Sequence, residues 1–413
     1  MFGLVMNHAL SVIMAITLSF TGLFGQGFNK AVGISNTAYN LTGQTIPGNA
    51  AQKLVNKIKV GIDLGNTFDA SDCSWVSDEL DYESAWCGAK TTKAYIKKIK
   101  SLGFNAIRIP VSWHNHVSGA DYTISEAWLD RVQEVVDWCI DEDMYVIINI
   151  HHDNTISTEN NAFFYPSTKY IDQSEKYVKA IWTQLSAKFK DYDTHLIFES
   201  LNEPRLVGTH YEWWADVNNA DCIDAIKCIN KLNQDFVDTV RASGGNNAER
   251  FLMVPGYDAA ASGVTNKYFV IPTDTVKNRI ILTVHAYTPY NFALQSSSEG
   301  GSVKVFNYKK STSYNDILSM MKTLYSMYVS KGQPVMIDEF GARNKGNTKS
   351  RAAYARYFVA AGKAYGISCF WWDNNYFENS ATGEAFGIVD RTTCKVEFPA
   401  IVSGLMKYAK VIK

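Results

Sequence analysis

Eight short apolar runs alternate along the chain with longer stretches whose apolar residues recur at helical spacing. The runs are rich in Ile and Val and lack polar alternation, which is typical of strands in a parallel sheet buried on both faces. We expect strands at 60–64, 105–109, 145–150, 196–201, 251–254, 280–284, 335–338 and 367–371. We expect helices between them at 92–102, 128–142, 175–189, 223–242, 317–331 and 349–365.

The ends of three of these helices are marked by Gly103, Gly332 and Gly366, which follow the last helical residues. A helix C-terminus favours a residue that adopts a left-handed conformation. Each strand except the last is followed by a helical stretch, and a further helix near 398–409 closes the chain. The pattern predicts an α/β fold, a single (β/α)8 TIM barrel. An open doubly wound sheet is the competing fold, but no glycine fingerprint follows the first strand.

The first 56 residues precede this alternation. An apolar run at 9–20 fits the core of a signal peptide, although His8 stands before it in place of Lys or Arg, an atypical charged region. We therefore expect a signal peptide and lead-in over 1–30 and a secreted protein, with a retained membrane anchor as the alternative. We expect residues 31–56 to form a polar segment that ends in a short helix near 51–58, and 57–413 to form the barrel.

Charge and length limit the partners of the chain. Its 413 residues carry 40 Lys and Arg against 41 Asp and Glu, so no basic surface for nucleic acid is indicated. We expect a monomer. Aromatic residues make up 13% of the chain, and their faces suit sugar rings, although most of them serve packing.

The chain has seven cysteines, and six of them are near neighbours in sequence. In an exported protein this pattern indicates local disulfides, and the alternative is that all seven are reduced thiols. No Cys or His cluster has the spacing of a zinc site. Cys139 lies in an amphipathic stretch, where we expect a buried thiol. The expected disulfides are Cys73–Cys87, Cys222–Cys228 and Cys369–Cys394.

Two of the expected strands end in carboxylates. Asn202-Glu203 follow the fourth strand, and Pro204 ends that strand because proline cannot donate a ladder hydrogen bond. Asp338-Glu339 follow the seventh. In barrel enzymes the carboxyl ends of the strands carry the active site. Two carboxyl groups on different strands are what glycoside hydrolysis requires, one as acid and one as nucleophile.

Polar and aromatic residues follow other strands as well. Taken singly, each has a structural explanation, such as an ion pair, a satisfied core histidine or packing. Seven strand ends that carry such residues on one edge indicate a site. The further candidates are Asn66 and Asp69 after the first strand, Arg108 on the second, His151 and His152 after the third, His285 and Tyr287 after the sixth, and Trp372 on the eighth.

The roles of the carboxylates follow from their surroundings. We expect Glu203 to be the general acid, its pKa raised by enclosure and by the second carboxylate. We expect Glu339 to stay ionised beside Arg108 and the Tyr287 hydroxyl, as a nucleophile must. Asp338 is the alternative nucleophile, because it neighbours Glu339 at the same strand end.

The remaining candidates suit substrate binding. Asn202 can hydrogen-bond the sugar 2-hydroxyl, and His151 and His152 can hold the acid and position hydroxyl groups. Trp372 offers a floor for a pyranose ring. Because side chains alternate along a strand, Trp371 and Trp372 cannot both face the site.

Two other classes of function are compatible with single features of the sequence. A metal-dependent barrel hydrolase would use His151, His152 and Asp153, but the strand ends offer no further ligand set. A carbohydrate-binding barrel without activity would not need two intact carboxylates.

Five motifs together resemble glycoside hydrolase family 5, the largest cellulase family. The resemblance runs from about residue 57 to the end. It implies a (β/α)8 barrel, a retaining double displacement and no cofactor. The motifs are Arg108-Ile-Pro-Val-Ser-Trp113, Ile148-Asn-Ile-His-His-Asp153, Asn202-Glu-Pro-Arg205, His285-Ala-Tyr-Thr-Pro-Tyr290 and Asp338-Glu-Phe-Gly341.

This resemblance also assigns site residues and a substrate class. The invariant positions of the family fall on Arg108, His151, Asn202, Glu203, His285, Tyr287, Glu339 and Trp372. The segments 61–70, 164–167 and 211–214 are similar to an endoglucanase subfamily that also accepts xyloglucan, mixed-linkage glucan and xylan. Where members often have Trp-Asn or Val-Asn, this chain has Ile62-Asp63. Many relatives carry a carbohydrate-binding module or dockerin, and we expect neither in this chain.

We therefore expect a secreted, retaining endo-β-1,4-glucanase whose partner is a β-glucan polysaccharide. The alternative is that the same machinery acts mainly on xyloglucan, mixed-linkage glucan, xylan or mannan.

Overall fold

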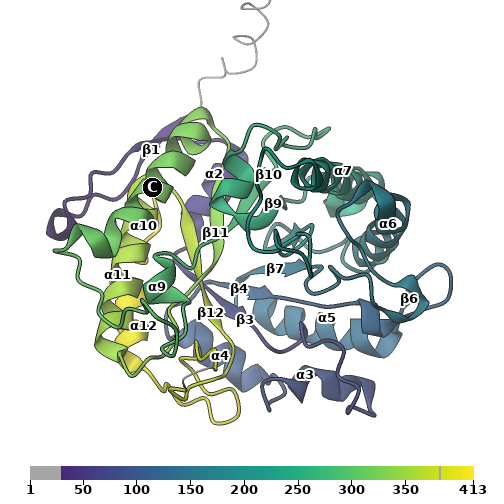
Figure 1. Cartoon of the computed structure of the whole chain (residues 1–413), viewed down its shortest axis with the longest axis horizontal. Helices are drawn as coiled ribbons and strands as arrows, with labels where there is room; N and C mark the ends of the chain where they lie inside the picture. The colour runs from purple at the N-terminus through teal and green to yellow at the C-terminus, as the bar shows by residue number, and fades with distance from the viewer. Residues whose placement is uncertain (1–28, 381–382) are drawn as a thin grey trace, which may run out of the picture.

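The computed structural model describes residues 29–380 and 383–413, and its centre is a closed barrel of parallel strands (Figure 1). The last strand pairs with the first, Phe370 opposite Gly61, which closes the barrel. The prediction of a single (β/α)8 barrel is confirmed. The eight strands are β3 (Gly61–Leu64), β4 (Ala106–Ile109), β7 (Tyr145–Asn149), β8 (Leu196–Glu199), β9 (Leu252–Ala260), β10 (Ile280–His285), β11 (Val335–Phe340) and β12 (Ser368–Asp373).

Helices surround the strands, as Figure 1 shows. The Thr92 side chain caps the first of them by accepting from the Tyr95 N–H, and Gly366 ends α11 at a φ of 74°. Gly103 and Gly332 also have positive φ, as expected from their places in the sequence. The main helices are α4 (Lys93–Ser101), α5 (Glu126–Asp141), α6 (Ile171–Lys188), α7 (Ala220–Ala242), α10 (Ser311–Met327), α11 (Thr348–Tyr365) and α12 (Pro399–Met406).

One connection is shorter than the expected alternation requires. Strand β9 is followed only by α8 (Ala261–Thr265). The Asn266 side chain donates to the carbonyls of Ser262 and Gly263, which ends this helix after five residues. An irregular segment then leads to β10. The helical stretch expected after every strand but the last is therefore present here only as a five-residue helix.

The amino end of the barrel is covered by a helix from the segment that precedes it. Strands β1 (Lys30–Val32) and β2 (Thr45–Pro47) form a small antiparallel sheet, and α2 (Ala50–Lys57) follows. The apolar residues of α2 pack into the barrel interior, where seven of the eight strands, all except β3, contribute one residue to a lower layer. This layer consists of Ala106, Ile147, Ile197, Met253, Ile281, Met336 and Phe370, and Leu54 and Val55 of α2 lie against it.

Two residues further along most strands, the interior changes character. Because side chains alternate in direction along a strand, positions two apart face the same way. This upper layer is buried, and most of its side chains are polar or charged. It consists of Asp63, Arg108, Asn149, Glu199, Thr283, Asp338 and Trp372.

All seven cysteines are free thiols, so the prediction of three disulfides is wrong. Cys222 and Cys228 lie on the same helix, α7, and six residues of helix separate Cα atoms by about 9 Å along the axis, beyond disulfide reach. The thiol of Cys73 donates to the Ser71 carbonyl and that of Cys87 to the Ala89 carbonyl. Although Cys73 and Cys87 are near neighbours in sequence, their thiols donate to different carbonyls and do not meet.

The Cys369 thiol lies on β12 and faces α11, where a side chain at Gly362 would meet its sulfur. Cys394 lies on a loop well past β12 and is only partly buried. Cys139, expected to be buried and reduced, is both.

The expected signal peptide falls on residues 1–28 and lies outside the part of the chain that the structure describes. Within the described part, no helix has the length and apolar character needed to cross a membrane.

Candidate active site

Arg108, fully buried at the end of β4, is the centre of the polar cluster above the lower layer. Its Nε and Nη2 donate to the two carboxylate oxygens of Glu199, at 2.7 and 3.0 Å. Its Nη1 donates to Glu339 Oε1 at 2.7 Å and to Asp63 Oδ1 at 3.3 Å. Nη2 also donates to Asn202 Oδ1 at 2.8 Å. One guanidinium thus fixes four groups on or just after three other strands, β3, β8 and β11.

The two candidate catalytic carboxylates face each other across His285. The His285 Nδ1 lies 2.7 Å from Glu203 Oε1, and the Tyr287 hydroxyl donates to Glu339 Oε2 at 3.0 Å. One oxygen of Glu203, one oxygen of Glu339 and a nitrogen of His285 all lie within 4.8 Å of one another. The side chain of Glu203 is 18% exposed and that of Glu339 is 6% exposed, so both can be reached from the carboxyl face of the barrel.

Irregular strand ends bring these residues to one place. The register between β11 and β12 shifts between Ile337 and Phe340, which lets the consecutive residues Asp338 and Glu339 both point inward. Asp338 lies below Glu339 and its side chain is completely buried, so no substrate can reach it. This excludes Asp338 as the alternative nucleophile. A second shift, between Val284 and His285, aligns His285 with Glu339.

The charge states in the free protein differ from those expected. Burial opposes ionisation of Glu203, but the hydrogen bond and charge of His285, together with Arg205, outweigh it and lower the pKa of Glu203 to about 2. Burial also opposes protonation of His285, but the charges of Glu339 and Glu203 raise its pKa to about 10. The pKa of Glu339 is raised, first by burial. We expected the opposite shifts because the sequence did not show that His285 bonds Glu203 directly.

An aromatic surface adjoins the pair. Trp372 faces the interior, whereas Trp371 points outward and donates to the Phe386 carbonyl, as the alternation predicted. A Cβ at Gly65 would lie 2.5 Å from the Trp372 ring, so only glycine there allows the ring its position. The Trp372 ring is parallel to that of His151, with 6.0 Å between centroids and 3° between planes.

The two histidines after β7 are neutral. Burial lowers the pKa of His151 well below its usual value and that of His152 to about 4. The Nδ1 of His151 lies 3.1 Å from the Asn149 amide, which orients the ring toward the cleft. His152 lies next to Trp86, with 5.5 Å between ring centroids.

The two candidate residues after β3, Asn66 and Asp69, lie in a turn beside the cleft. Asp69 accepts the backbone N–H groups of Asn66, at 2.9 Å, and Thr67, at 2.6 Å, so both of its oxygens are used within the turn. Asn66 itself has a φ of 57°. Asp69 therefore shapes the turn, and the half-buried Asn66 is the one of the two whose side chain is free to meet a ligand.

Metal binding by His151, His152 and Asp153 is not supported by their arrangement. The Asp153 carboxylate accepts from the Trp113 and His114 backbone N–H groups and from the Tyr177 hydroxyl, away from the cleft. The described residues contain three groups with ligand-type atoms close together: Asp69, His151 and His152; Glu199, His285 and Asp338; and Glu203, His285 and Glu339. Asp69 is occupied by the turn, and the other two groups surround the Arg108 cation.

Three residues that contact the site were not among the predicted site residues: Glu199, Asp63 and Arg205. Glu199 and Asp63 lie in the same interior layer as Arg108. Counting by two from the strand ends could have found them, since Glu199 follows Ile197 at that spacing. Arg205 donates to Glu203 Oε2 at 3.4 Å, and its guanidinium lies 4.1 Å from the centre of the exposed Trp213 ring.

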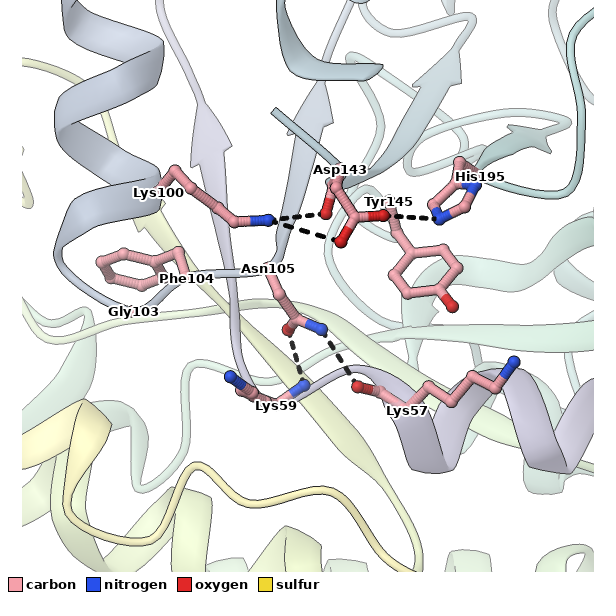
Figure 2. Close-up of a pocket in the computed structure, with 9 residues that line it drawn as sticks. All are labelled: Lys57, Lys59, Lys100, Gly103, Phe104, Asn105, Asp143, Tyr145 and His195. Carbon is pink, nitrogen blue, oxygen red and sulfur yellow. Dashed lines mark hydrogen bonds and ion pairs between the residues drawn. The ribbon is translucent and has the colours of Figure 1, made fainter. Parts of the chain in front are cut away.

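A hollow of about 320 Å³ lies at the opposite, amino end of the barrel (Figure 2). In it Asp143 contacts both Lys100 and His195, and Asn105 bonds Lys57 and Lys59 through their backbones. None of the candidate site residues lines it. The candidate site therefore lies on the carboxyl face of the barrel, away from this hollow.

Comparisons with known proteins agree with this geometry. A model of the cellulase family, glycosyl hydrolase family 5, matches residues 67–378. Endoglucanase A of Clostridium longisporum is 42% identical over 360 residues, which cover 87% of this chain and 66% of that protein. This chain spans 66% and 41% of the lengths of two curated relatives that it matches.

Two solved structures have the same fold at high identity. The cellotetraose complex of a family 5 lichenase variant from Caldicellulosiruptor sp. F32 has a TM-score of 0.87 and 54% identity, covering 90% of this chain and 98% of that one. A broad-specificity endoglucanase from Ruminococcus champanellensis with bound cellotriose has a TM-score of 0.78 and 42% identity, covering 87% and 99%.

Proposed function

This chain belongs to the cellulase family, glycosyl hydrolase family 5, and we propose that it is a retaining endo-β-1,4-glucanase with Glu339 as nucleophile and Glu203 as acid/base. The observation that carries this proposal is the spacing of the two carboxylates, which have oxygens within 4.8 Å of each other. An inverting enzyme holds its carboxyl groups roughly 6.5–9.5 Å apart to admit a water between them. The short spacing supports direct attack of Glu339 on the sugar.

The first half of the reaction forms a covalent intermediate. A Glu339 oxygen attacks the anomeric carbon, the glycosidic bond breaks, and Glu203 gives its proton to the departing oxygen. Arg108 and Tyr287 each hold one oxygen of Glu339, at 2.7 and 3.0 Å, so the carboxylate is oriented before attack. Asn202, fixed by Arg108, is available to the sugar 2-hydroxyl.

The second half reverses these roles. Glu203 takes a proton from water, the water oxygen attacks the anomeric carbon, and Glu339 leaves as a carboxylate. Because two inversions cancel, the product keeps the β configuration. NMR of the anomeric proton in the first minutes of cello-oligosaccharide hydrolysis tests this: we expect the β signal first, and an initial α signal would contradict double displacement.

The role of Glu203 can be tested separately. In Glu203→Gln we expect hydrolysis of polysaccharide to be lost, while an aryl glycoside with a good leaving group still forms the glycosyl-enzyme because departure needs no acid. Equal losses on both substrates would contradict the assignment of Glu203 as the acid.

The preferred polysaccharide is proposed from the relatives. They include endoglucanases, a lichenase and a xyloglucan-specific endo-β-1,4-glucanase. We propose β-1,4-glucan as the main substrate, and the second candidate is a hemicellulose or mixed-linkage glucan acted on by the same residues. Initial rates on carboxymethyl-cellulose, lichenan, xyloglucan, xylan and mannan, with analysis of the products, decide between them.

We also propose that the enzyme acts outside the cell as a monomer. The support for export is the apolar run at residues 9–20, and the support for action outside the cell is the size of a polysaccharide substrate. Activity measured in the medium and in the cell fraction of an expressing culture tests the first part. Sedimentation of the purified protein tests the second.

A further inference from the structure

Arg205, in the loop that follows β8, contacts the acid/base directly. Its Nη1 donates to the Glu203 carbonyl at 2.9 Å and to Glu203 Oε2 at 3.4 Å. The other carboxylate oxygen, Oε1, lies 2.7 Å from His285 Nδ1. Because His285 engages Oε1, Oε2 is the oxygen left to meet the glycosidic oxygen of a bound glucan, and Arg205 is the group beside it.

Hydrogen bonds alone hold the Arg205 side chain loosely. The contact from Nη1 to Glu203 Oε2 is longer than the about 2.7–3.2 Å that is usual for an N–H···O bond. The Nε atom is buried and has no hydrogen-bond partner among the described residues, and Glu212 Oε1 lies 3.7 Å from it. These contacts do not fix the plane of the guanidinium, so its orientation depends on a further support.

The ring of Trp213 provides this support. The guanidinium carbon of Arg205 lies 4.1 Å from the centre of the Trp213 ring. A planar guanidinium packs against an aromatic face, and the contact combines a cation–π attraction with a restriction on how the group can turn. Trp213 itself is 61% exposed, so the ring is not part of the core. Its described role in the fold is to cover Arg205.

The backbone at both ends of this loop segment is held by other side chains. Asn154 Oδ1 accepts the Arg205 N–H at 2.7 Å, and Asn154 Nδ2 donates to the Arg205 carbonyl at 3.1 Å. The Tyr257 hydroxyl accepts the Leu206 N–H at 3.0 Å and donates to the Tyr211 carbonyl. A change of the Trp213 side chain should therefore free the Arg205 guanidinium without altering the course of the loop.

We propose that Arg205 is a positioning residue: held against Trp213, it keeps Oε2 of Glu203 directed at the glycosidic oxygen. This inference rests on the proposed function. In the first half of the reaction Oε2 carries the proton to the departing oxygen, and in the second half the same oxygen takes a proton from the attacking water. Arg205 and Trp213 touch neither reacting bond and act only through the orientation of Glu203.

The test is the steady-state kinetics of Trp213→Leu, which removes the aromatic face and keeps the charge of Arg205. On cellotetraose, whose leaving group needs acid assistance, we expect kcat to fall by about 10–100-fold with little change in KM, since a misplaced catalytic group costs this much. A general disturbance of the cleft would not be selective for acid assistance, so a second substrate is needed.

That substrate is an aryl cellobioside with a good leaving group, whose glycosylation needs no acid. Here we expect kcat/KM of Trp213→Leu to stay unchanged. Both kcat and KM should fall together, because hydrolysis of the glycosyl-enzyme still needs Glu203 as base and the intermediate accumulates. Arg205→Gln, which removes the guanidinium, is expected to show the same signature on both substrates.

Two further variants make the result specific. Trp213→Phe keeps an aromatic face and is expected to retain most of kcat on cellotetraose. Arg279 has a matching arrangement directly before β10, with its guanidinium carbon 4.6 Å from the centre of the Phe251 ring and Nη2 2.8 Å from Glu249 Oε2. Arg279→Gln is the control and is expected to change kinetics on neither substrate.

The possible outcomes separate the roles. An unchanged kcat of Trp213→Leu on cellotetraose, or equal losses of kcat/KM on both substrates, overturns the positioning role. A raised KM with unchanged kcat also overturns it, because Trp213 would then only bind the glucan chain. A loss in Trp213→Phe as large as in Trp213→Leu would contradict a role for the aromatic face. Inactivity of the unaltered protein on both substrates would instead contradict the proposed function itself.

Discussion

The two layers of side chains inside the barrel lie only two residues apart along the strands, but they differ in polarity and in what covers them. The lower layer is apolar, is sealed by α2 and contains Ile147, Ile197 and Met336. The upper layer begins two residues later and holds Arg108 among three fully buried carboxylates, those of Asp63, Glu199 and Asp338. Burying charges costs stability unless they are paired, so the upper layer serves the reaction and the lower layer has to supply the stability. Substitutions in the two layers should therefore have separable effects.

The largest expected effect lies at the top of the upper layer. In Glu339→Gln the amide cannot attack the sugar, so we expect kcat on cello-oligosaccharides to fall by about 10⁴-fold or more. The melting temperature should stay the same or rise, because a buried charge is removed. Steady-state kinetics and thermal melting measure the two quantities. Residual kcat in Glu339→Gln above about 1% of that of the unaltered protein would contradict the assignment of Glu339 as the nucleophile.

The lower layer should show the reverse behaviour. Ile197→Ala removes a fully buried side chain and is expected to reduce the free energy of unfolding by about 2–5 kcal/mol, with kcat/KM per folded molecule unchanged. Denaturant titration provides the measurement. Ile197→Val is the matched control, at about 0.5–1.5 kcal/mol. A loss of activity in folded Ile197→Ala protein would mean that the layers are not independent.

Glu199 tests whether the buried part of the upper layer acts through Arg108. Its carboxylate binds two nitrogens of Arg108, at 2.7 and 3.0 Å, and never reaches the cleft. Glu199→Gln is expected to lower kcat/KM by about 10–150-fold, since a hydrogen bond to a charged group contributes about 1.5–3 kcal/mol. Glu249→Gln breaks the exposed ion pair with Arg279 and serves as the control, with no change in kcat/KM expected.

The smallest expected effect concerns Asp63, where members of the family often have asparagine. Burial, followed by the charges of Glu339 and Asp338 against that of Arg108, raises the pKa of Asp63 well above 3.8. The folded state therefore holds this proton more tightly than the unfolded state, and its contribution to stability decreases as pH rises above about 4. Asp63→Asn removes this dependence.

The measurement is the free energy of unfolding of both proteins at pH 4 and pH 5. The free energy of unfolding of Asp63→Asn, relative to that of the unaltered protein, should increase by about 1 kcal/mol from pH 4 to pH 5. A constant difference would show that Asp63 is already ionised in the folded protein.

The sequence was sufficient for the barrel because its strands are continuous apolar runs and its helices are amphipathic. The site residues at the carboxyl edge could also be predicted from the sequence, since Arg108, Glu203 and Glu339 all lie at strand ends. The structure brings these three residues together around His285 and Tyr287.

What could not be predicted depends on how strands bend and which groups meet. The shift that turns both Asp338 and Glu339 inward leaves no simple pattern in the sequence. The predicted pKa shifts of Glu203 and Glu339 were wrong for a related reason: they depend on the contact of His285 with Glu203, which the sequence does not show. The disulfide prediction relied on proximity along the chain, which on α7 is not proximity of sulfur atoms.

The position of α2 at the amino end of the barrel also determines how the protein can be attached to a solid support. The Ile412 N–H donates to the Asn56 carbonyl at 3.0 Å, so the last residues lie against α2 at the face opposite the cleft. An enzyme immobilised on a solid support through Lys413 would therefore point its cleft outward. Such an orientation leaves the cleft open to a long β-glucan chain.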